Sequence, residues 1–308
     1  MTDLTKRQKT AFVTGAASGI GKSLTLELAS RNYKVFATDV NYEGLKLVLE
    51  KFPENIIIYK FDVSKPEEIA KTHEFVISEL NKLENQSPPK LDLLYNNAGI
   101  ACSFPLIEVP DDAMSRILNI SLQAPIRITK AFSDLVINAK GTIAFTGSVT
   151  KSLPIVYNGM YSTVKAGLEA YASTLSVEME PFDVKVIHVV TGNINTGISD
   201  NTPWPEDSVY LSTQSLKESY RARKTFLEKK IKKMEPHDYA KSVISQIERA
   251  NVKTFAIYEG PTSWSTPFVS NYLPRFVIVN FLRNLFKLSS AWDSLRKKMN
   301  AMNGDKTK

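Results

Sequence analysis

A glycine-rich segment near the N-terminus constrains the fold more than any other stretch. Residues 10–14 form a short apolar run, which Gly15-Ala-Ala-Ser-Gly19-Ile-Gly21 follows directly, opening a helical pattern to about Arg31. Glycines between a buried strand and a helix let the backbone turn tightly and approach a pyrophosphate, whose charge the helix N-terminus stabilises. The spacing is G-x-x-x-G-x-G, and we expect a dinucleotide-phosphate site here; a glycine-rich turn without a ligand is the alternative. The residues expected to line this site are Gly15, Ser18, Gly19, Ile20 and Gly21.

Strand and helix patterns alternate along the rest of the chain. Further buried strands are expected at 34–38, 56–61, 91–95, 142–146, 184–190 and 254–258. One intervening helix should begin with a capping box at Ser64–Glu67, and another should cover 111–139 with a local distortion at Asn119. This alternation predicts one Rossmann-type, doubly wound parallel sheet of about seven strands, with helices on both faces. We assign residues 1–262 to this α/β domain and expect 197–214 to form a mobile loop or lid.

The second strand ends at Asp39, a position that bears on the choice of cofactor. A carboxylate there can accept hydrogen bonds from the adenosine ribose hydroxyls of NAD(H), and it would repel the 2′-phosphate of NADP(H). The residue before Gly19 is Ser18, so no basic side chain there offsets the repulsion. Asp39 therefore favours NAD(H); the alternative is that it serves only as a helix N-cap.

Ser148, Tyr161 and Lys165 form the candidate catalytic group. Ser148 follows the apolar strand 142–146, and residues 161–180 have helical periodicity. Residues four apart share a helix face, so the Lys165 ammonium can approach the Tyr161 phenol. A nearby cation favours the phenolate, and we expect it to lower the tyrosine pKa so that the phenol can exchange protons near neutrality. Taken alone, a surface tyrosine beside a solvated lysine is the alternative.

Composition narrows the classes of function. The net charge is +7, with basic residues concentrated in 217–233 and 283–308, which indicates a local partner rather than a nucleic-acid-binding protein. The single cysteine, Cys102, excludes an intrachain disulfide and fits a reducing compartment. The polar first residues carry no secretory signal, and no uncharged apolar run is long enough to span a bilayer. We therefore expect the protein to face the cytosol.

These motifs together resemble those of the short-chain dehydrogenase/reductase family. The matching residues, in the family's order, are Thr14-Gly15-x-x-x-Gly19-x-Gly21, Asp62-Val63, Asn96-Asn97-Ala98-Gly99, Asn119, Ser148 and Tyr161-x-x-x-Lys165. The resemblance implies that Tyr161 exchanges a proton with the substrate oxygen, that Ser148 hydrogen-bonds the same oxygen, and that Lys165 holds the nicotinamide ribose. It also implies a water path for proton relay at Asn119, and no metal ion is expected. Beyond the glycine turn, the implied cofactor-binding residues are Asp39, Asp62, Val63, Asn97, Ala98, Gly99, Tyr161, Lys165, Ile194 and Thr196.

A closer similarity is to the fungal 1-acyldihydroxyacetone phosphate reductases. It rests on residues 91–99, 139–143 and 145–148, and on Thr191-Gly192 where most relatives have proline-glycine. It implies NADPH-dependent reduction of 1-acyldihydroxyacetone phosphate to 1-acylglycerol 3-phosphate, a step of phosphatidate biosynthesis, at the cytosolic face of the endoplasmic reticulum and lipid droplets. The wider family implies a homodimer or homotetramer. Close relatives carry arginines where this chain has Asp39-Val40-Asn41, which keeps an NAD-dependent hydroxysteroid, retinol or other lipophilic alcohol dehydrogenase as the alternative.

The C-terminal stretch 263–308 departs from the α/β pattern and is assigned to an amphipathic extension. Within 275–287 one helical stripe is polar (Asn280, Arg283, Asn284, Lys287) and the opposite side is apolar (Ile278, Phe281, Leu282, Leu285). Such a helix suits a membrane interface or a lipid-droplet monolayer. Packing on the enzyme core, or a dimer contact, is the alternative that the sequence leaves open.

Overall fold

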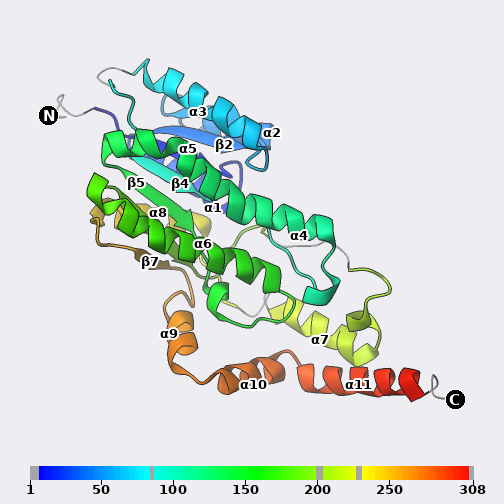
Figure 1. The fold of residues 1–308 in the computed structure, drawn as a ribbon. Helices are drawn as coiled ribbons and strands as arrows, with labels where there is room; N and C mark the ends of the chain where they lie inside the picture. The colour runs from blue at the N-terminus through cyan, green and yellow to red at the C-terminus, as the bar shows by residue number, and fades with distance from the viewer. Residues whose placement is uncertain (1–6, 84–86, 199–203, 227–230, 305–308) are drawn as a thin grey trace.

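Seven parallel strands form one sheet in the computed structural model, which describes residues 7–83, 87–198, 204–226 and 231–304 (Figure 1). The strand order is β3-β2-β1-β4-β5-β6-β7, and every neighbouring pair is parallel. The strands are β1 (Thr10–Thr14), β2 (Lys34–Asp39), β3 (Ile56–Lys60), β4 (Leu93–Asn96), β5 (Thr142–Thr146), β6 (Lys185–Thr191) and β7 (Ala256–Glu259). The predicted doubly wound parallel sheet is confirmed.

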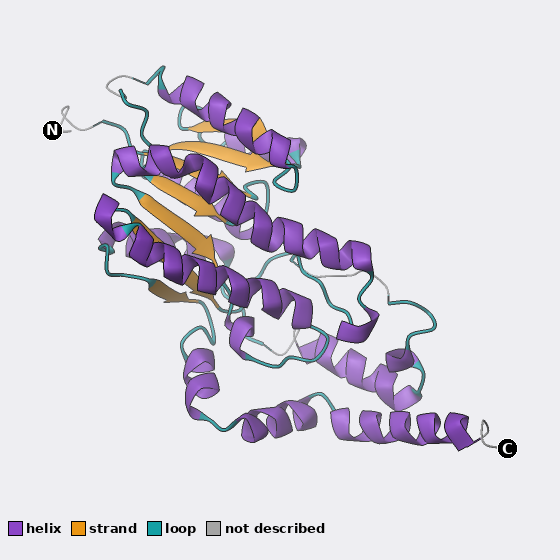
Figure 2. Ribbon diagram, viewed as in Figure 1, coloured by secondary structure: helices purple, strands orange, loops and turns teal. Residues whose placement is uncertain are grey.

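Helices cover both faces of the sheet because its strands are apolar on both faces (Figure 2). Side chains alternate along a strand, so Phe12 packs on one face while Ala11 and Val13 pack on the other. The core on the Ala11 face is completed by α1 (Gly19–Ser30), α2 (Tyr42–Leu49) and α8 (Pro236–Arg249). The core on the Phe12 face is completed by α3 (Pro66–Leu80), α5 (Ala124–Ala139) and α6 (Gly159–Glu178).

The sheet has its topological switch point between β1 and β4. Connections from these neighbouring strands diverge, which opens a crevice at their carboxyl ends where ligands of such folds bind. The glycine turn 15–21 leaves β1 and residues 97–99 leave β4, so both predicted cofactor segments lie at this crevice. Ser148 follows the next strand, β5, at the same edge.

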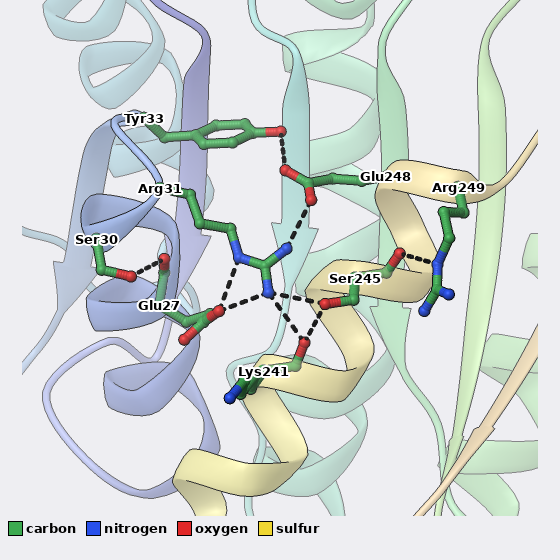
Figure 3. Close-up of polar contacts among 8 residues, drawn as sticks. All are labelled: Glu27, Ser30, Arg31, Tyr33, Lys241, Ser245, Glu248 and Arg249. Atoms are coloured by element: carbon green, nitrogen blue, oxygen red, sulfur yellow. Dashed lines mark hydrogen bonds and ion pairs between the residues drawn. The ribbon is translucent and has the colours of Figure 1, made fainter.

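A network of hydrogen bonds and ion pairs at the C-terminal end of α1 holds this helix against α8 (Figure 3). Arg31 contacts Glu27 of its own helix at 2.6 Å and Glu248 of α8 at 2.6 Å. It also donates a hydrogen bond to Ser245 Oγ at 2.8 Å, and Tyr33 Oη donates to Glu248 at 3.2 Å. Because the N-terminus of α1 is the expected phosphate site, these contacts help to fix where that terminus points.

Two local predictions have different outcomes. The prediction of a capping box at Ser64–Glu67 is wrong, because α3 begins at Pro66. The Ser64 hydroxyl Oγ instead donates to Asp62 Oδ1 at 2.6 Å. Glu68 is the residue that reaches back, accepting from the Asp62 N–H at 2.8 Å. The predicted distortion at Asn119 is confirmed, because a π-helical turn, η2 (Asn119–Gln123), separates α4 (Asp111–Leu118) from α5.

Three helices follow β7 in the part of the chain that the structure describes: α9 (Ser265–Tyr272), α10 (Arg275–Leu285) and α11 (Leu288–Gly304) (Figure 1). α11 packs against α7 (Gln214–Thr225), and α9 contacts the short helix η3 (Val149–Ser152). Ser219 Oγ of α7 donates to the Phe286 carbonyl at 2.7 Å. Ile278, Leu282 and Phe286 are buried in a cluster that includes the loop residues Leu153, Ile155 and Val156. Of the predicted apolar side of α10, Ile278 and Leu282 therefore pack on the protein, as the alternative expected, whereas Phe281 is 64% exposed. None of the helices described is long and apolar enough to cross a membrane.

Candidate active site

The glycine turn has the backbone that a phosphate site requires. Gly15 and Gly19 have φ angles of +70° and +53°, in the left-handed region that favours glycine. A Cβ on Gly21 would overlap the Gly15 carbonyl. Ser18 precedes α1 with an extended backbone, and its side chain makes no capping hydrogen bond among the residues described. The N–H groups at the start of α1 are thus left uncapped by that side chain, and the turn fits a pyrophosphate.

Asn97 ties the loop after β4 to the neighbouring strands. Its amide nitrogen Nδ2 donates to the Thr14 carbonyl at 3.0 Å, and its Oδ1 accepts from Thr146 Oγ1 at 3.1 Å. The backbone N–H groups of Asn97 and Ala98 both donate to Thr14 Oγ1, each at 3.0 Å. Asn97 therefore shapes the cofactor crevice through its side chain. Gly99 lies next to the catalytic side, since a Cβ there would be 3.5 Å from Ser121 Oγ and 4.0 Å from Lys165 Nζ.

Asp39 lies beside the glycine turn rather than capping a helix. Its Oδ2 accepts from the Ala17 N–H at 3.0 Å and its Oδ1 from the Asn41 N–H at 2.9 Å. The N-cap of α2 is Asn41, whose Oδ1 accepts from the Gly44 N–H at 3.0 Å. Each carboxylate oxygen has a second lone pair, so Asp39 keeps the capacity to accept from ribose hydroxyls.

The other predicted cofactor residues lie on loops at the same edge of the sheet. Asp62 and Val63 follow β3, and Asp62 Oδ1 accepts from the Ser64 N–H at 3.0 Å. Thr196, after β6, reaches the glycine turn: its Cγ2 is 3.4 Å from the position a Cβ on Gly19 would take. Ile194 packs at the margin of the Ala11-side core and pairs with Met234 in an isolated bridge.

Ser148 is held at the end of β5 by its own local contacts. It precedes the short helix η3 (Val149–Ser152), and its Oγ accepts from the Thr150 N–H at 3.2 Å. Gly147 must be a glycine, since a Cβ there would overlap the buried imidazole of His188 on β6. The close contact of Gly147, just after β5, with His188 on β6 therefore helps to fix the position of Ser148 at the end of β5.

Tyr161 and Lys165 converge on Ser148 from the first turns of α6. The Tyr161 phenol lies close enough to the Ser148 side chain for that hydroxyl to favour its ionised form. Lys165 Nζ lies 5.6 Å from the Tyr161 ring centroid and donates to the Thr146 carbonyl at 2.7 Å. The structure therefore brings together the three predicted catalytic side chains.

The direction of the tyrosine pKa shift differs from the prediction. Burial raises the pKa of Tyr161 to about 12, and the nearby Ser148 hydroxyl opposes only part of that rise. Burial also lowers the pKa of Lys165 to about 8. The prediction of a lowered tyrosine pKa is wrong for this arrangement, because desolvation penalises the phenolate more than its neighbours stabilise it. At neutral pH the phenol is a proton donor beside a largely protonated lysine.

The pH dependence of ketone reduction should report on Lys165. The ammonium loses its charge as the pH rises through about 8, so kcat/KM should be level below that pH and fall about tenfold per pH unit above it. Lys165→Arg keeps a cation at every accessible pH and should remove the decline. A decline that persists in this variant would assign the titration to another group.

Asn119 lies close by, but its side chain is used elsewhere. Its Nδ2 donates to the Ser64 carbonyl at 2.8 Å, and its Oδ1 accepts from Arg127 Nη1 at 2.8 Å. These bonds link the π-helical turn to the loop after β3. The proton-relay role that the family resemblance implies for Asn119 stays a prediction.

An aromatic wall beside Tyr161 was not predicted from the sequence. Residues 199–203 of the predicted mobile loop or lid lie outside the described residues, but its later part is held in place. Trp204 Nε1 donates to the Ser103 carbonyl at 2.6 Å, and Glu108 accepts from Ser208 Oγ at 2.5 Å and the Val209 N–H at 2.9 Å. The apolar cluster that includes Tyr161 also contains Tyr157, Trp204, Tyr210, Tyr220 and Trp292. Trp204, a tryptophan in an otherwise polar and proline-rich loop, is the sequence feature that could have indicated that this loop packs on the protein.

Known proteins resemble this chain in sequence and in fold. The family model described as short chain dehydrogenase matches residues 9–206. The NADPH-dependent 1-acyldihydroxyacetone phosphate reductase of Saccharomyces cerevisiae is 35% identical over 292 residues, which cover 94% of this chain and 95% of that protein. The reductase of the same name from Schizosaccharomyces pombe is 30% identical, with 68% and 70% covered. A short-chain dehydrogenase structure from Streptomyces avermitilis has a TM-score of 0.71 at 20% identity over 97% of this chain and 99% of that one. A Burkholderia phymatum structure in complex with NAD has a TM-score of 0.68 at 19% identity over 82% and 88%.

Proposed function

Because this chain belongs to the short-chain dehydrogenase/reductase family, an oxidoreductase family, we propose that it reduces a lipophilic ketone, converting 1-acyldihydroxyacetone phosphate to 1-acylglycerol 3-phosphate. The observation that carries the reaction type is the convergence of Tyr161, Ser148 and Lys165 at the carboxyl edge of the sheet. The substrate rests on the 35% identity to the yeast reductase over nearly the whole of both chains.

The residues at the crevice fit a nicotinamide dinucleotide. The turn at Gly15 and Gly19 and the N-terminus of α1 would hold the pyrophosphate, Asp39 the adenosine ribose and Lys165 the nicotinamide ribose. When bound, the dinucleotide supplies the hydride.

The protein's own contribution is proton transfer and charge stabilisation. Tyr161 Oη donates its proton to the carbonyl oxygen as negative charge develops there, and Ser148 Oγ hydrogen-bonds the same oxygen. The Lys165 ammonium stabilises the phenolate that remains. A phenol with a pKa of about 12 is protonated at neutral pH, which suits an acid in the reductive direction.

The surroundings of Tyr161 fit an acylated, phosphorylated substrate. Tyr210 and Tyr220, the half-buried tyrosines of the aromatic wall, would offer apolar surface to a hydrocarbon chain, and the buried Tyr157 and Trp204 pack in the same cluster. Arg223 of α7 is only 5% exposed. Burial raises the pKa of Tyr157, and the positive charge of Arg223 opposes that rise. A cation therefore lies near the aromatic wall, where a substrate phosphate would be favoured.

The second candidate is an NAD-dependent dehydrogenase of hydroxysteroids, retinol or another lipophilic alcohol. Asp39 favours it, because its carboxylate stands at the end of β2 where a 2′-phosphate would come close. Lys60 weakens the case that Asp39 excludes NADP(H). It is paired with Asp39 in the register of β3 with β2, and its side chain is exposed. Lys60 therefore brings a positive charge to this edge of the sheet, which the sequence alone did not reveal.

Initial rates separate the two candidates when acyldihydroxyacetone phosphate is assayed with NADPH and NADH as hydride donors, and a hydroxysteroid and retinol are assayed with NADP⁺ and NAD⁺ as hydride acceptors. We expect the phosphorylated ketone to have the highest kcat/KM, and failure to reduce it would eliminate the proposed substrate. The double variant Asp39→Ala/Val40→Arg should shift the cofactor preference toward NADPH by at least about tenfold. An unchanged preference would show that Asp39 serves only to hold Ala17 and Asn41.

A further inference from the structure

The corner between α9 and α10 exposes an unusual amount of aromatic surface. All seven residues from 271 to 277 are exposed, with the sequence Asn-Tyr-Leu-Pro-Arg-Phe-Val. Tyr272 is 73% exposed and Phe276 is 68% exposed. One and two turns before Tyr272 on α9, Phe268 and Trp264 are 61% and 74% exposed. We call residues 271–277 with Phe268 and Trp264 the α9–α10 corner.

These aromatic residues are not the uncovered remainder of a core. The side of α10 that packs on the protein is already occupied by Ile278 and Leu282, which are each 8% exposed. Phe268 and Tyr272 contact each other, with ring centroids 4.8 Å apart, and still face outward. Several large aromatic side chains exposed on one short stretch of chain usually mark a binding surface.

The charges around the corner identify its partner. Between Glu259 and Asp293 the chain has no acidic residue, while Arg275, Arg283 and Lys287 are basic and exposed. Aromatic rings with flanking cations suit the interface of a lipid layer with anionic headgroups, where the rings sit at headgroup depth and the cations meet the phosphates.

We propose that the α9–α10 corner docks the protein on an anionic lipid surface. The covered side of α10 packs against Leu153, Ile155 and Val156, in the loop that joins Ser148 to Tyr161. Docking through the corner therefore places this loop of the active site beside the lipid phase. That consequence rests on the proposed function, since an acylated substrate would come from the same phase.

Cosedimentation of the full-length protein with vesicles tests the docking surface without any substrate. The protein should bind vesicles of phosphatidylcholine and phosphatidylserine more tightly than vesicles of phosphatidylcholine alone. Tyr272→Ser/Phe276→Ser should lower the partition coefficient at least about tenfold. Arg275→Gln should lower it roughly fivefold on the anionic vesicles only. The matched control is Phe182→Ser, which removes a ring that is 48% exposed after α6, outside the corner, and should leave binding unchanged.

Other results would overturn the proposal. Wild-type protein that stays in the supernatant with both vesicle types would do so, as would equal losses in the Phe182 and corner variants. A wild-type dimer that the corner variants dissociate in sedimentation velocity, with vesicle binding unaffected, would assign the surface to a second copy of the chain. Turnover of a short-chain, water-miscible ketone should be equal in the wild type and the corner variants. If the wild-type protein has no reductase activity, the proposed function is wrong, but the vesicle-binding result is unaffected.

Discussion

Tyr161→Phe should lower kcat/KM for ketone reduction by roughly 10²–10⁴-fold, the usual contribution of a positioned general acid. The substitution removes the phenol hydroxyl that lies beside Ser148, on a ring whose centroid is 5.6 Å from Lys165 Nζ. The ring itself remains, so the aromatic wall and the cofactor crevice should keep their shape. Dinucleotide affinity, measured by fluorescence titration, should stay within about twofold of the wild type.

The matched control for this variant is Tyr171→Phe. Tyr171 lies on the same helix, α6, and packs edge-on against Phe145 with ring centroids 6.0 Å apart. Losing its hydroxyl leaves the three converging side chains untouched, and turnover should change little. Full activity in the Tyr161 variant, or equal losses in the two, would remove Tyr161 from the reaction.

Gly21→Ala should weaken dinucleotide binding by at least about tenfold and lower the melting temperature. A methyl group there would overlap the Gly15 carbonyl and lie 2.5 Å from Asn97 Nδ2. Those atoms belong to the glycine turn and to the loop after β4, which are hydrogen-bonded to each other. Because one of them is backbone, the strain cannot be relieved by a side-chain rotation. Isothermal titration with NADPH and with NADH measures the first effect, and thermal unfolding of the free protein measures the second.

Gly197→Ala is the matched substitution. Among the described residues other than its two chain neighbours, no atom lies within 4 Å of a Cβ at Gly197, and the residue is in the exposed loop after β6. Its affinity and melting temperature should equal those of the wild type. Equal affinities in the two variants would mean that the close packing of the glycine turn has no part in binding.

The sequence was informative where a local pattern decides the structure. Strands such as 10–14 and 142–146 are fully buried, so their continuous apolar runs are visible without coordinates. The glycine turn could also be predicted from the sequence, because Gly15 and Gly19 take left-handed backbone angles that few other residues adopt. The spacing of Tyr161 and Lys165 placed them on one helix face.

Features that depend on contacts between distant segments were not accessible in this way. The pKa of Tyr161 follows from how deeply the loops bury it, and spacing along one helix says nothing of that burial. Lys60 approaches Asp39 only through the register of β2 with β3. The exposed aromatics of the α9–α10 corner could not be told from the covered side of α10 until the helix had packed on residues 153–156.

The central claim is that Tyr161 and Ser148 act on one substrate oxygen. A double-mutant cycle with Tyr161→Phe, Ser148→Ala and the combined variant tests it most directly, using kcat/KM for acyldihydroxyacetone phosphate. Groups that act as a unit are strongly non-additive, so the double variant should lose far less than the product of the two single losses. Two losses that simply multiply would show that the hydroxyl and the phenol act independently, and would contradict the account.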